Sequence, residues 1–254
     1  MAKGKDANRM ECSNCRGVSL LNTAYNILSN ILFARISPFA ENIIENYQCG
    51  FRKNRSTTNQ IFTLRQILEK TKEFGIETHL LFIDFKSAYD TIKRDQLYNA
   101  MNEFNISNKL IRLTRMTMEN TQSQVRIQSD LSDSIATKKG LRQGDSLACL
   151  LFNLALEKVV RNAGIQTSGT IFYKSVQLLT YANDIDIRVI ARSRTALKEA
   201  FLSLERAAGE MGLRINEKKT KYLATRESKN QQSSLKLRIS ILKPYRVLRT
   251  WAPL

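Results

Sequence analysis

The chain has no long hydrophobic run, since none of its apolar stretches approaches the roughly 20 residues needed to span a bilayer. Its first thirty residues also lack the apolar core of a secretion signal ahead of the first helical pattern. We therefore expect a protein that neither crosses a membrane nor is secreted. With 254 residues, of which 43% are hydrophobic, the chain can form one large domain or two small ones with a real core.

Cysteine and histidine are scarce, with four and one respectively. The cysteines show no disulfide spacing, which predicts reduced thiols in an intracellular protein. Cys12 and Cys15 form a CxxC pair, but a zinc site needs about two more ligands, and Cys49, Cys149 and His79 are widely scattered. We expect no zinc site.

Acidic residues are outnumbered, with 23 Asp and Glu against 40 Lys and Arg, so the net charge is +17. An imbalance of this size predicts a polyanionic partner, nucleic acid before a membrane surface. The alternative is a cationic protein that is merely soluble.

The first half of the chain shows helical periodicity. One pattern lies in "VSLLNTAYNILSNILFARISPFAENII", and we expect Pro38 to end that helix. Ser56 is placed to cap a second helix, in which Ile61, Leu64 and Leu68 make one face. "THLLFIDF" then predicts a buried strand. Two further helical patterns follow, "RDQLYNAMNEF" and "NKLIRLTRMTMEN".

The second half alternates strands and helices. "QVRIQSDLSDSIAT" predicts a hairpin, "SLACLLFNLALEKVVRNA" a helix, and "LLTYANDIDIRVIA" a second hairpin with a polar tip. A last helix ends at Gly212, and a last strand or pair of strands follows it. Without an insertion at 106–144, residues 78–224 read βα-ββ-αβ, which predicts an α+β protein with a ferredoxin-like antiparallel sheet.

Three carboxylates stand out. Asp84 ends the buried strand, Asp90 follows six residues later, and Asp184 lies at the tip of the second hairpin beside Asn183. In a split βαβ unit the strand and the hairpin are neighbours, so Asp84 and Asp184 converge and can bind Mg²⁺. Two such ions activate a 3′-hydroxyl and stabilise the leaving pyrophosphate. The alternatives are a local hydrogen bond for Asp84, ordinary turn residues at the tip, and a helix N-cap for Asp90.

Several stretches resemble reverse transcriptases. "LLFIDFKSAYD", "GLRQGDSLACLLFNLALE", "YANDIDI" and "GLRINEKKTKYL" are similar, in this order, to successive motifs of those enzymes, and "CSNCRGVSLLNTAYNILSNIL" and "QCGFRKNRSTTNQIFTLRQI" resemble their fingers segments. The order looks most like the non-LTR (LINE-like) retrotransposon class, over roughly residues 5 to 224. Group II intron-type polymerases share several of the motifs and remain open.

This resemblance implies a fold and a domain plan. The fold would be the fingers and palm of a right-hand polymerase, with the ferredoxin-like βαββαβ core as the palm. Residues 1–78 would form the fingers segment, 79–224 the palm with inserted helices near 106–144, and 225–254 a linker and a remnant tail. No thumb segment is recognisable after Leu223.

The resemblance also implies roles. It makes Asp84 and Asp184 the ligands of Mg²⁺, or of Mn²⁺ in its place, and Lys219 the proton donor to pyrophosphate. RNA template, DNA primer and dNTP would be the partners, and the nucleus the place of work. The other carried-over positions are Arg16 for the triphosphate, Tyr89 as the gate against the ribose 2′-hydroxyl, Gln143 and Gly144 at the nascent base pair, and Arg52 and Arg55 for template or triphosphate. The alternatives are a core aromatic for Tyr89 and a solvated surface charge for Arg16 and for Lys219.

The sequence departs from the family at Asn183, where the pattern has an essential aspartate, and at Cys15, where an aromatic residue usually stands. Asn183 removes one charge and one strong ligand, which indicates a decayed element fragment. The leading hypothesis is an RNA-directed DNA polymerase domain with impaired activity. The alternative is a nucleic-acid-binding remnant without catalysis. A nucleotide cyclase, which also uses two acids on such a core, is disfavoured by the "RQGD" helix and the basic fingers region.

Overall fold

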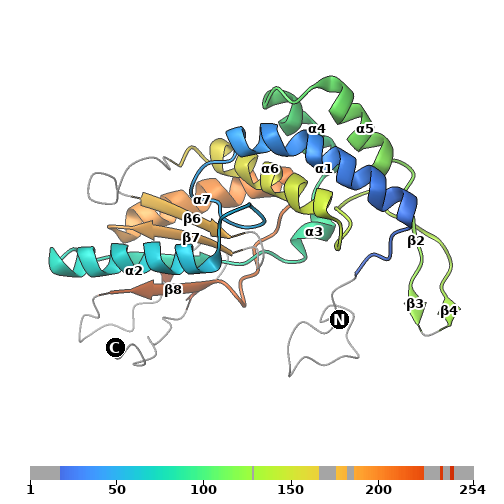
Figure 1. Cartoon of the computed structure of the whole chain (residues 1–254). Coiled ribbons are helices and arrows are strands. Elements are labelled where there is room, and N and C mark those ends of the chain that lie inside the picture. The colour runs from blue at the N-terminus through green and yellow to red at the C-terminus, as the bar shows by residue number, and fades with distance from the viewer. Residues whose placement is uncertain are drawn as a thin grey trace. The chain divides into compact units, whose positions relative to one another are not determined.

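The computed structural model describes residues 18–127, 129–165, 176–181, 186–225, 235–236 and 241–242. These residues form a mixed α+β protein, as expected from the sequence (Figure 1). They divide into two compact units: unit 1 contains the described residues of Met1–Ile43 and Tyr89–Leu154, and unit 2 those of Ile44–Ala88 and Ala155–Leu254. Within the described ranges, none of the helices combines the length and the apolar character that a membrane span requires.

Unit 2 is built around a four-stranded sheet. Its strands are β1 (His79–Ile83), β6 (Val176–Tyr181), β7 (Asp186–Ala191) and β8 (Lys221–Ala224), in the order β6-β7-β1-β8, and every neighbouring pair is antiparallel. The expected strand, hairpin and last strand are thereby confirmed. Four of the five β1 side chains are buried on the faces of the sheet, and this explains the continuous apolar run in its sequence.

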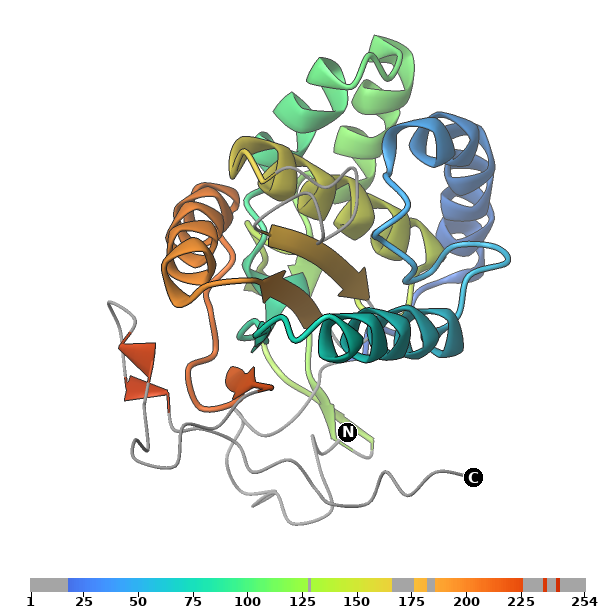
Figure 2. The same ribbon diagram turned by 90° about the vertical axis from the view of Figure 1, so that its left-hand side faces the viewer.

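Two helices pack on this sheet. The half-buried aliphatic side chains of α2 (Thr57–Glu73) lie against a buried cluster on β1, β6 and β7. The buried side of α7 (Arg194–Met211) contacts the same three strands. Figures 1 and 2 show β6 and β7 between the two helices. The cluster consists of Leu80, Leu179 and Ile190, and the α2 side chains are Leu64, Ile67 and Leu68.

Local capping signals set the ends of these helices. The Ser56 hydroxyl accepts a hydrogen bond from the N–H of Asn59, and Ser193 caps α7 in the same way. Gly212 ends α7 in the left-handed region, with φ +93°. These two expectations, the Ser56 cap and the Gly212 stop, are confirmed. The expected α2 face is correct at Leu64 and Leu68 but wrong at Ile61, whose side chain is 51% exposed.

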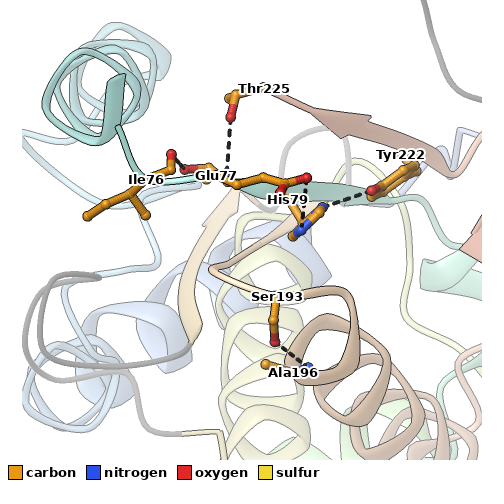
Figure 3. Close-up of polar contacts among 8 residues, drawn as sticks. Ile76, Glu77, His79, Ser193, Ala196, Tyr222 and Thr225 are labelled. Carbon is orange, nitrogen blue, oxygen red and sulfur yellow. Dashed lines mark hydrogen bonds and ion pairs between the residues drawn. The ribbon is translucent and has the colours of Figure 1, made fainter. Parts of the chain in front are cut away.

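Polar contacts fasten β1 to β8 where β1 begins (Figure 3). Nδ1 of the buried His79 lies 2.8 Å from the hydroxyl oxygen of Tyr222, and the N–H of Thr78 donates to Oγ1 of Thr225 over 3.0 Å. These contacts therefore lie at the start of β1, whereas Asp84 follows its other end.

Unit 1 is mainly helical. Its helices are α1 (Thr23–Ile43), α4 (Arg94–Glu103) and α5 (Asn108–Met118), and α5 contacts both of the others. The short α3 (Ala88–Thr91) and the long α6 (Ser146–Asn162) each have residues in both units. All four leucines expected on the inner side of α6 are buried: Leu147, Leu150, Leu151 and Leu154.

Two expectations for unit 1 are wrong. Pro38 does not end α1, because the helix continues to Ile43 with Pro38 inside it. Proline cannot donate to the carbonyl of Ala34, but both residues are exposed, so water can satisfy that carbonyl. Asp90 is not an N-cap either, because it lies within α3.

The expected hairpin after α5 is confirmed as a two-part ribbon. β2 (Gln122–Ser123) pairs with β5 (Ile135–Ala136), and β3 (Arg126–Ile127) pairs with β4 (Asp130–Leu131). Arg94 holds its base by donating to the carbonyl oxygens of Met118, Thr137 and Gly140. Near the C-terminus, β9 (Leu235–Lys236) pairs with β10 (Ile241–Leu242).

Candidate active site

Asp84 directly follows the buried end of β1. There the main chain stays paired with the segment ahead of β8: the N–H of Asn216 donates to the carbonyl of Asp84 over 2.7 Å, and the N–H of Lys86 donates to the carbonyl of Arg214 over 2.8 Å. Asp84 is half-buried. Its backbone is therefore set by hydrogen bonds at the edge of the core, where a carboxylate can face a ligand.

Lys219 lies in the turn that closes on Asp84. The carbonyl of Asn216 accepts hydrogen bonds from the N–H groups of Lys219 (3.1 Å) and Thr220 (2.9 Å). The buried Thr220 hydroxyl accepts from the N–H of Asp84 over 3.4 Å and donates to the Asn216 carbonyl over 2.9 Å. Lys219 itself is exposed. Within unit 2, the structure thus brings Asp84 and the turn that carries Lys219 together.

The second hairpin meets the same end of the sheet. In register, Ile83 is opposite Ile187, and Tyr181 is opposite Asp186. The chain therefore leaves β6 and enters β7 beside the end of β1 that leads into Asp84. Asn183 and Asp184, which connect these strands, lie outside the described residues.

Cationic side chains gather along the paired segments that hold Asp84. They lie on the segment after β1, on the segment ahead of β8 and on the first residue of β8, and all are exposed. Positive charge of this density attracts anionic ligands. We call this group the cationic rim, and its members are Lys86, Arg214, Lys218, Lys219 and Lys221.

The described residues hold no group of three or more His, Cys, Asp or Glu side chains that could bind a metal ion. Asp84 offers carboxylate oxygens, the hard donors that Mg²⁺ and Mn²⁺ prefer. The donor chemistry at this strand end therefore fits such an ion. Of the cysteines, Cys49 is buried in unit 2 and Cys149 is half-buried in unit 1, whereas Cys12 and Cys15 are outside the described residues.

Tyr89 is packed in unit 1. Its ring is 8% exposed and stacks on Phe152, with 4.8 Å between ring centroids. Burial raises the pKa of its hydroxyl, and the neighbouring Cys149 adds to the rise in pKa. Its carbonyl accepts from the N–H of Leu141 over 2.7 Å. Both earlier interpretations, core aromatic and sugar gate, are compatible with a ring held this firmly.

Gln143 and Gly144 form the loop ahead of α6. Gln143 is half-buried, and its carbonyl accepts from the N–H of Ser19 over 2.9 Å. Gly144 is exposed and adopts φ +111°, a conformation that side chains other than hydrogen rarely allow. A backbone hydrogen bond and the positive φ of Gly144 therefore define the conformation of this loop in unit 1.

Arg52 and Arg55 are engaged within their own loop in unit 2. Arg52 donates to the carbonyls of Glu45 (2.8 Å) and Gln48 (3.0 Å), and Arg55 donates to the side-chain oxygen of Asn46 (2.6 Å). The structure gives both arginines a part in shaping this loop, whatever else they contact. Arg16, the other predicted phosphate contact, lies outside the described residues.

Sequence reasoning missed Tyr25 and Asp145. The hydroxyl of Tyr25 donates to the carboxylate of Asp145 over 2.7 Å, although the two residues are far apart in the chain. Asp145 stands just before α6, where an aspartate is a recognisable helix cap, so that part of its role was readable. Its bond to Tyr25 had no local signal.

Comparison with known proteins bears on this geometry. Residues 3–237 match the family described as reverse transcriptase (RNA-dependent DNA polymerase). The transposon TX1 uncharacterized 149 kDa protein of Xenopus laevis is 24% identical over 213 residues, which cover 83% of this chain and 16% of that protein. The Pol polyprotein of the type-1 retrotransposable element R2 of Nasonia vitripennis is 21% identical over 243 residues, covering 96% and 23%.

A third relative is the probable RNA-directed DNA polymerase from transposon BS of Drosophila melanogaster, 21% identical, with 81% of this chain and 23% of that protein covered. The chain thus spans less than a quarter of the length of each of these three relatives. Among solved structures, apo telomerase of Candida tropicalis, truncated from its C-terminal domain, is similar in fold. It has a TM-score of 0.56 and 15% identity, with 82% of this chain and 42% of that chain covered.

Proposed function

This chain belongs to the reverse transcriptase (RNA-dependent DNA polymerase) family and is related to the non-LTR elements R2, TX1 and BS, and on that premise we propose that it is the polymerase domain of such an element, with its own activity weakened by Asn183. It would extend a DNA primer on an RNA template with dNTPs. The nucleus, where such an element inserts, is the proposed place of work.

One observation carries this proposal. Asp84, the turn of Lys219 and the two strand ends that flank Asn183 and Asp184 all meet at one end of the sheet in unit 2. That is the arrangement that a two-carboxylate nucleotidyl-transfer site requires, because residues about 100 positions apart must serve one reacting phosphate.

The strand order supports a palm of the ferredoxin-like kind. β1 leads through helices to the β6–β7 hairpin, and α7 then leads to β8, so that β7 and β8 flank β1. We propose that 79–224 is this palm, with an insertion at 106–144, that 1–78 is the fingers segment and that 225–254 is a linker and tail.

Each side chain has a proposed task. Asp84 and Asp184 would hold Mg²⁺, or Mn²⁺, which when bound lowers the pKa of the primer 3′-hydroxyl and offsets charge on the leaving pyrophosphate. Lys219 would give a proton to that pyrophosphate, since its exposed side chain belongs to the turn that closes on Asp84. The remaining assignments are Tyr89 as sugar gate, Gln143 and Gly144 at the nascent base pair, Arg16 at the triphosphate, and Arg52 and Arg55 at template or triphosphate.

Asn183 bears on both the proposed function and its alternative. An amide oxygen fits the space of a carboxylate oxygen but offers only a dipole, and Mg²⁺ prefers anionic oxygen. A loss of about 4 kcal/mol of transition-state stabilisation lowers a rate by about three decades. The alternative, a nucleic-acid-binding remnant without catalysis, is favoured by the same residue.

Primer extension on an RNA template tests the proposal. We expect the parent chain to extend a primer weakly or not at all, and Asn183→Asp to raise the rate by about two to three decades. Asp84→Asn in the Asn183→Asp chain should abolish the gain, whereas Asp95→Asn, at an exposed carboxylate on α4, should leave it intact.

Two outcomes contradict the proposal. Extension by the parent chain equal to that of Asn183→Asp would show that Asn183 is not at the metal site. Binding of RNA and primer without extension by either chain would favour the non-catalytic alternative.

A further inference from the structure

The Gln143–Gly144 loop is tied down from both sides by the segment that begins α1. Ser19, ahead of α1, donates its N–H to the carbonyl of Gln143 over 2.9 Å. Residues 142 and 145, which flank the dipeptide, both contact Tyr25 in the first turn of α1. All of these residues belong to unit 1.

Both carboxylate oxygens of Asp145, the residue after Gly144, accept hydrogen bonds. Oδ1 accepts from the N–H of Leu147 over 3.0 Å and thereby caps α6, while Oδ2 accepts from the hydroxyl of Tyr25 over 2.7 Å. The residue is 5% exposed. A buried carboxylate needs such partners to offset its desolvation, so the bond from Tyr25 and the cap hold the residue in one orientation.

Arg142, the residue before Gln143, also contacts Tyr25. Its guanidinium lies 4.3 Å from the centroid of the Tyr25 ring and donates to Oγ1 of Thr121 over 3.5 Å. A cation over an aromatic face is attracted to it. Tyr25 therefore contacts the residue before Gln143 with its ring and the residue after Gly144 with its hydroxyl.

We propose that Tyr25 and Asp145 are positioning residues that hold the Gln143–Gly144 loop in the conformation in which it meets the nascent base pair. Neither residue touches the reacting atoms. The functional half of this inference rests on the polymerase function proposed above, whereas the holding of the loop by Tyr25 does not.

The chemistry of the pair keeps the hold in place at physiological pH. Burial, followed by the hydrogen bond to Asp145, raises the pKa of Tyr25 to about 12. The tyrosine hydroxyl therefore stays protonated and donates a hydrogen bond to the carboxylate throughout the neutral range. Hydrogen bonds to charged acceptors are among the stronger ones in proteins.

Hydrogen exchange of the loop amides in the free chain tests the holding role without any catalysis. For Tyr25→Phe, which keeps the ring under Arg142 and removes only the hydroxyl, we expect exchange over residues 142–147 to be roughly tenfold faster, which corresponds to about 1.4 kcal/mol. Tyr98→Phe is the matched control, because Tyr98 is buried in the same unit with Arg115 over its ring at 4.9 Å. It should leave these amides unchanged.

Asp145→Asn separates the cap from the bond to Tyr25. The amide oxygen can still accept from the N–H of Leu147, whereas the uncharged NH2 group replaces the carboxylate oxygen that faces Tyr25. It should therefore produce part of the change seen in Tyr25→Phe. The double variant should exchange no faster than Tyr25→Phe alone, since the two residues act through one hydrogen bond.

Steady-state kinetics in the Asn183→Asp chain test the functional half. We expect Tyr25→Phe to raise KM for the correct dNTP by about tenfold, to change kcat less, and to increase misincorporation, whereas Tyr98→Phe should move none of these values. A tenfold factor in KM corresponds to about 1.4 kcal/mol.

Three results overturn the inference. Loop exchange unchanged in Tyr25→Phe, or raised equally in Tyr98→Phe, removes the holding role. Faster loop exchange with unchanged KM and fidelity in an active Asn183→Asp chain removes the positioning role. If Asn183→Asp is inactive, the polymerase proposal and with it the positioning role fail, and exchange alone decides whether Tyr25 holds the loop.

Discussion

The hydroxyl group of Tyr47 donates a 2.5 Å hydrogen bond to Oε2 of Glu157, a carboxylate that is 2% exposed inside unit 2. The N–H of Glu45 also donates to Oε2, over 3.4 Å, and Nε of Arg161 donates to Oε1 over 2.7 Å. Burial, followed by the charge of Glu157, raises the pKa of Tyr47. The buried charge is thus matched by three donors, and it joins the segment ahead of α2 to α6.

Tyr47→Phe should therefore destabilise unit 2. Removing the hydroxyl leaves a buried carboxylate with one strong donor fewer, for which about 1.5–3 kcal/mol is expected. Urea unfolding followed by circular dichroism measures the loss. Tyr98→Phe in unit 1, where the structure shows an arginine over the ring, is the control and should lose less than about 0.5 kcal/mol. Equal losses in the two variants would mean that Glu157 does not depend on Tyr47.

Stability should fall as the pH is lowered from 7.5 to 5.5, because of His79. Burial holds the pKa of this histidine below its ordinary value of 6.5 in the folded chain. Below pH 6.5 the unfolded chain therefore binds a proton that the folded chain resists, so stability is present above that pH and is lost below it, by at most about 1.4 kcal/mol per pH unit. In His79→Gln the difference between the two pH values should shrink. An unchanged pH dependence in that variant would assign the effect to other groups.

Gly140→Ala should disrupt the turn that leads to the Gln143–Gly144 loop. Gly140 has φ +81°, and a Cβ atom there would lie 2.8 Å from backbone atoms of Asp90. Backbone must then shift, so we expect a loss above about 2 kcal/mol. Gly75→Ala is a matched comparison, with φ +63° and no atom within 4 Å of the added Cβ, and should lose about 1 kcal/mol. A smaller loss at Gly140 than at Gly75 would contradict the close approach to Asp90.

The cationic rim should account for part of the salt dependence of nucleic-acid binding. Each phosphate contact contributes about 0.9 to the slope of log affinity against log salt on duplex and about 0.7 on single strands. Lys86→Gln with Lys218→Gln should lower the slope by about 1.4–1.8. Lys72→Gln with Lys198→Gln, at exposed positions on α2 and α7, removes the same charge elsewhere in unit 2 and should change the slope much less. Equal changes in the two pairs would mean that binding senses only net charge.

Tyr89 should govern sugar selection if it is the gate. In the Asn183→Asp chain, Tyr89→Val should admit ribonucleotides at least tenfold better, and it should also destabilise the chain by about 2–4 kcal/mol because the buried ring stacks on Phe152. Phe152→Leu disturbs the same stack without opening the gate. If both variants, or neither, relax the choice between dNTP and rNTP, then Tyr89 is a core residue alone.

Local signals determined most of the secondary structure of this protein. Ser56 marks the start of α2 and Gly212 marks the end of α7, because their side-chain and backbone preferences act within a few residues. The apolar run at 79–83 and the polar tip between two apolar stretches predicted β1 and the β6–β7 hairpin, since both patterns come from burial of a strand face. Motif order was also enough for the family, and it named Asp84 and Lys219 before their neighbours were known.

Tertiary structure alone decided how those pieces meet. The hydrogen bonds between Tyr25 and Asp145 and between Tyr47 and Glu157 each join residues more than 100 positions apart, and nothing in the local pattern of either residue names its partner. The continuation of α1 past Pro38 and the exposed side chain of Ile61 also departed from the local pattern. For α1, burial of residues such as Ala40 beyond the proline helps to offset the cost of a proline inside a helix, about 3 kcal/mol. The close pairing of Asp84 with the turn of Lys219 depends on β8 lying beside β1, and strand order is a property of the folded sheet rather than of any one segment.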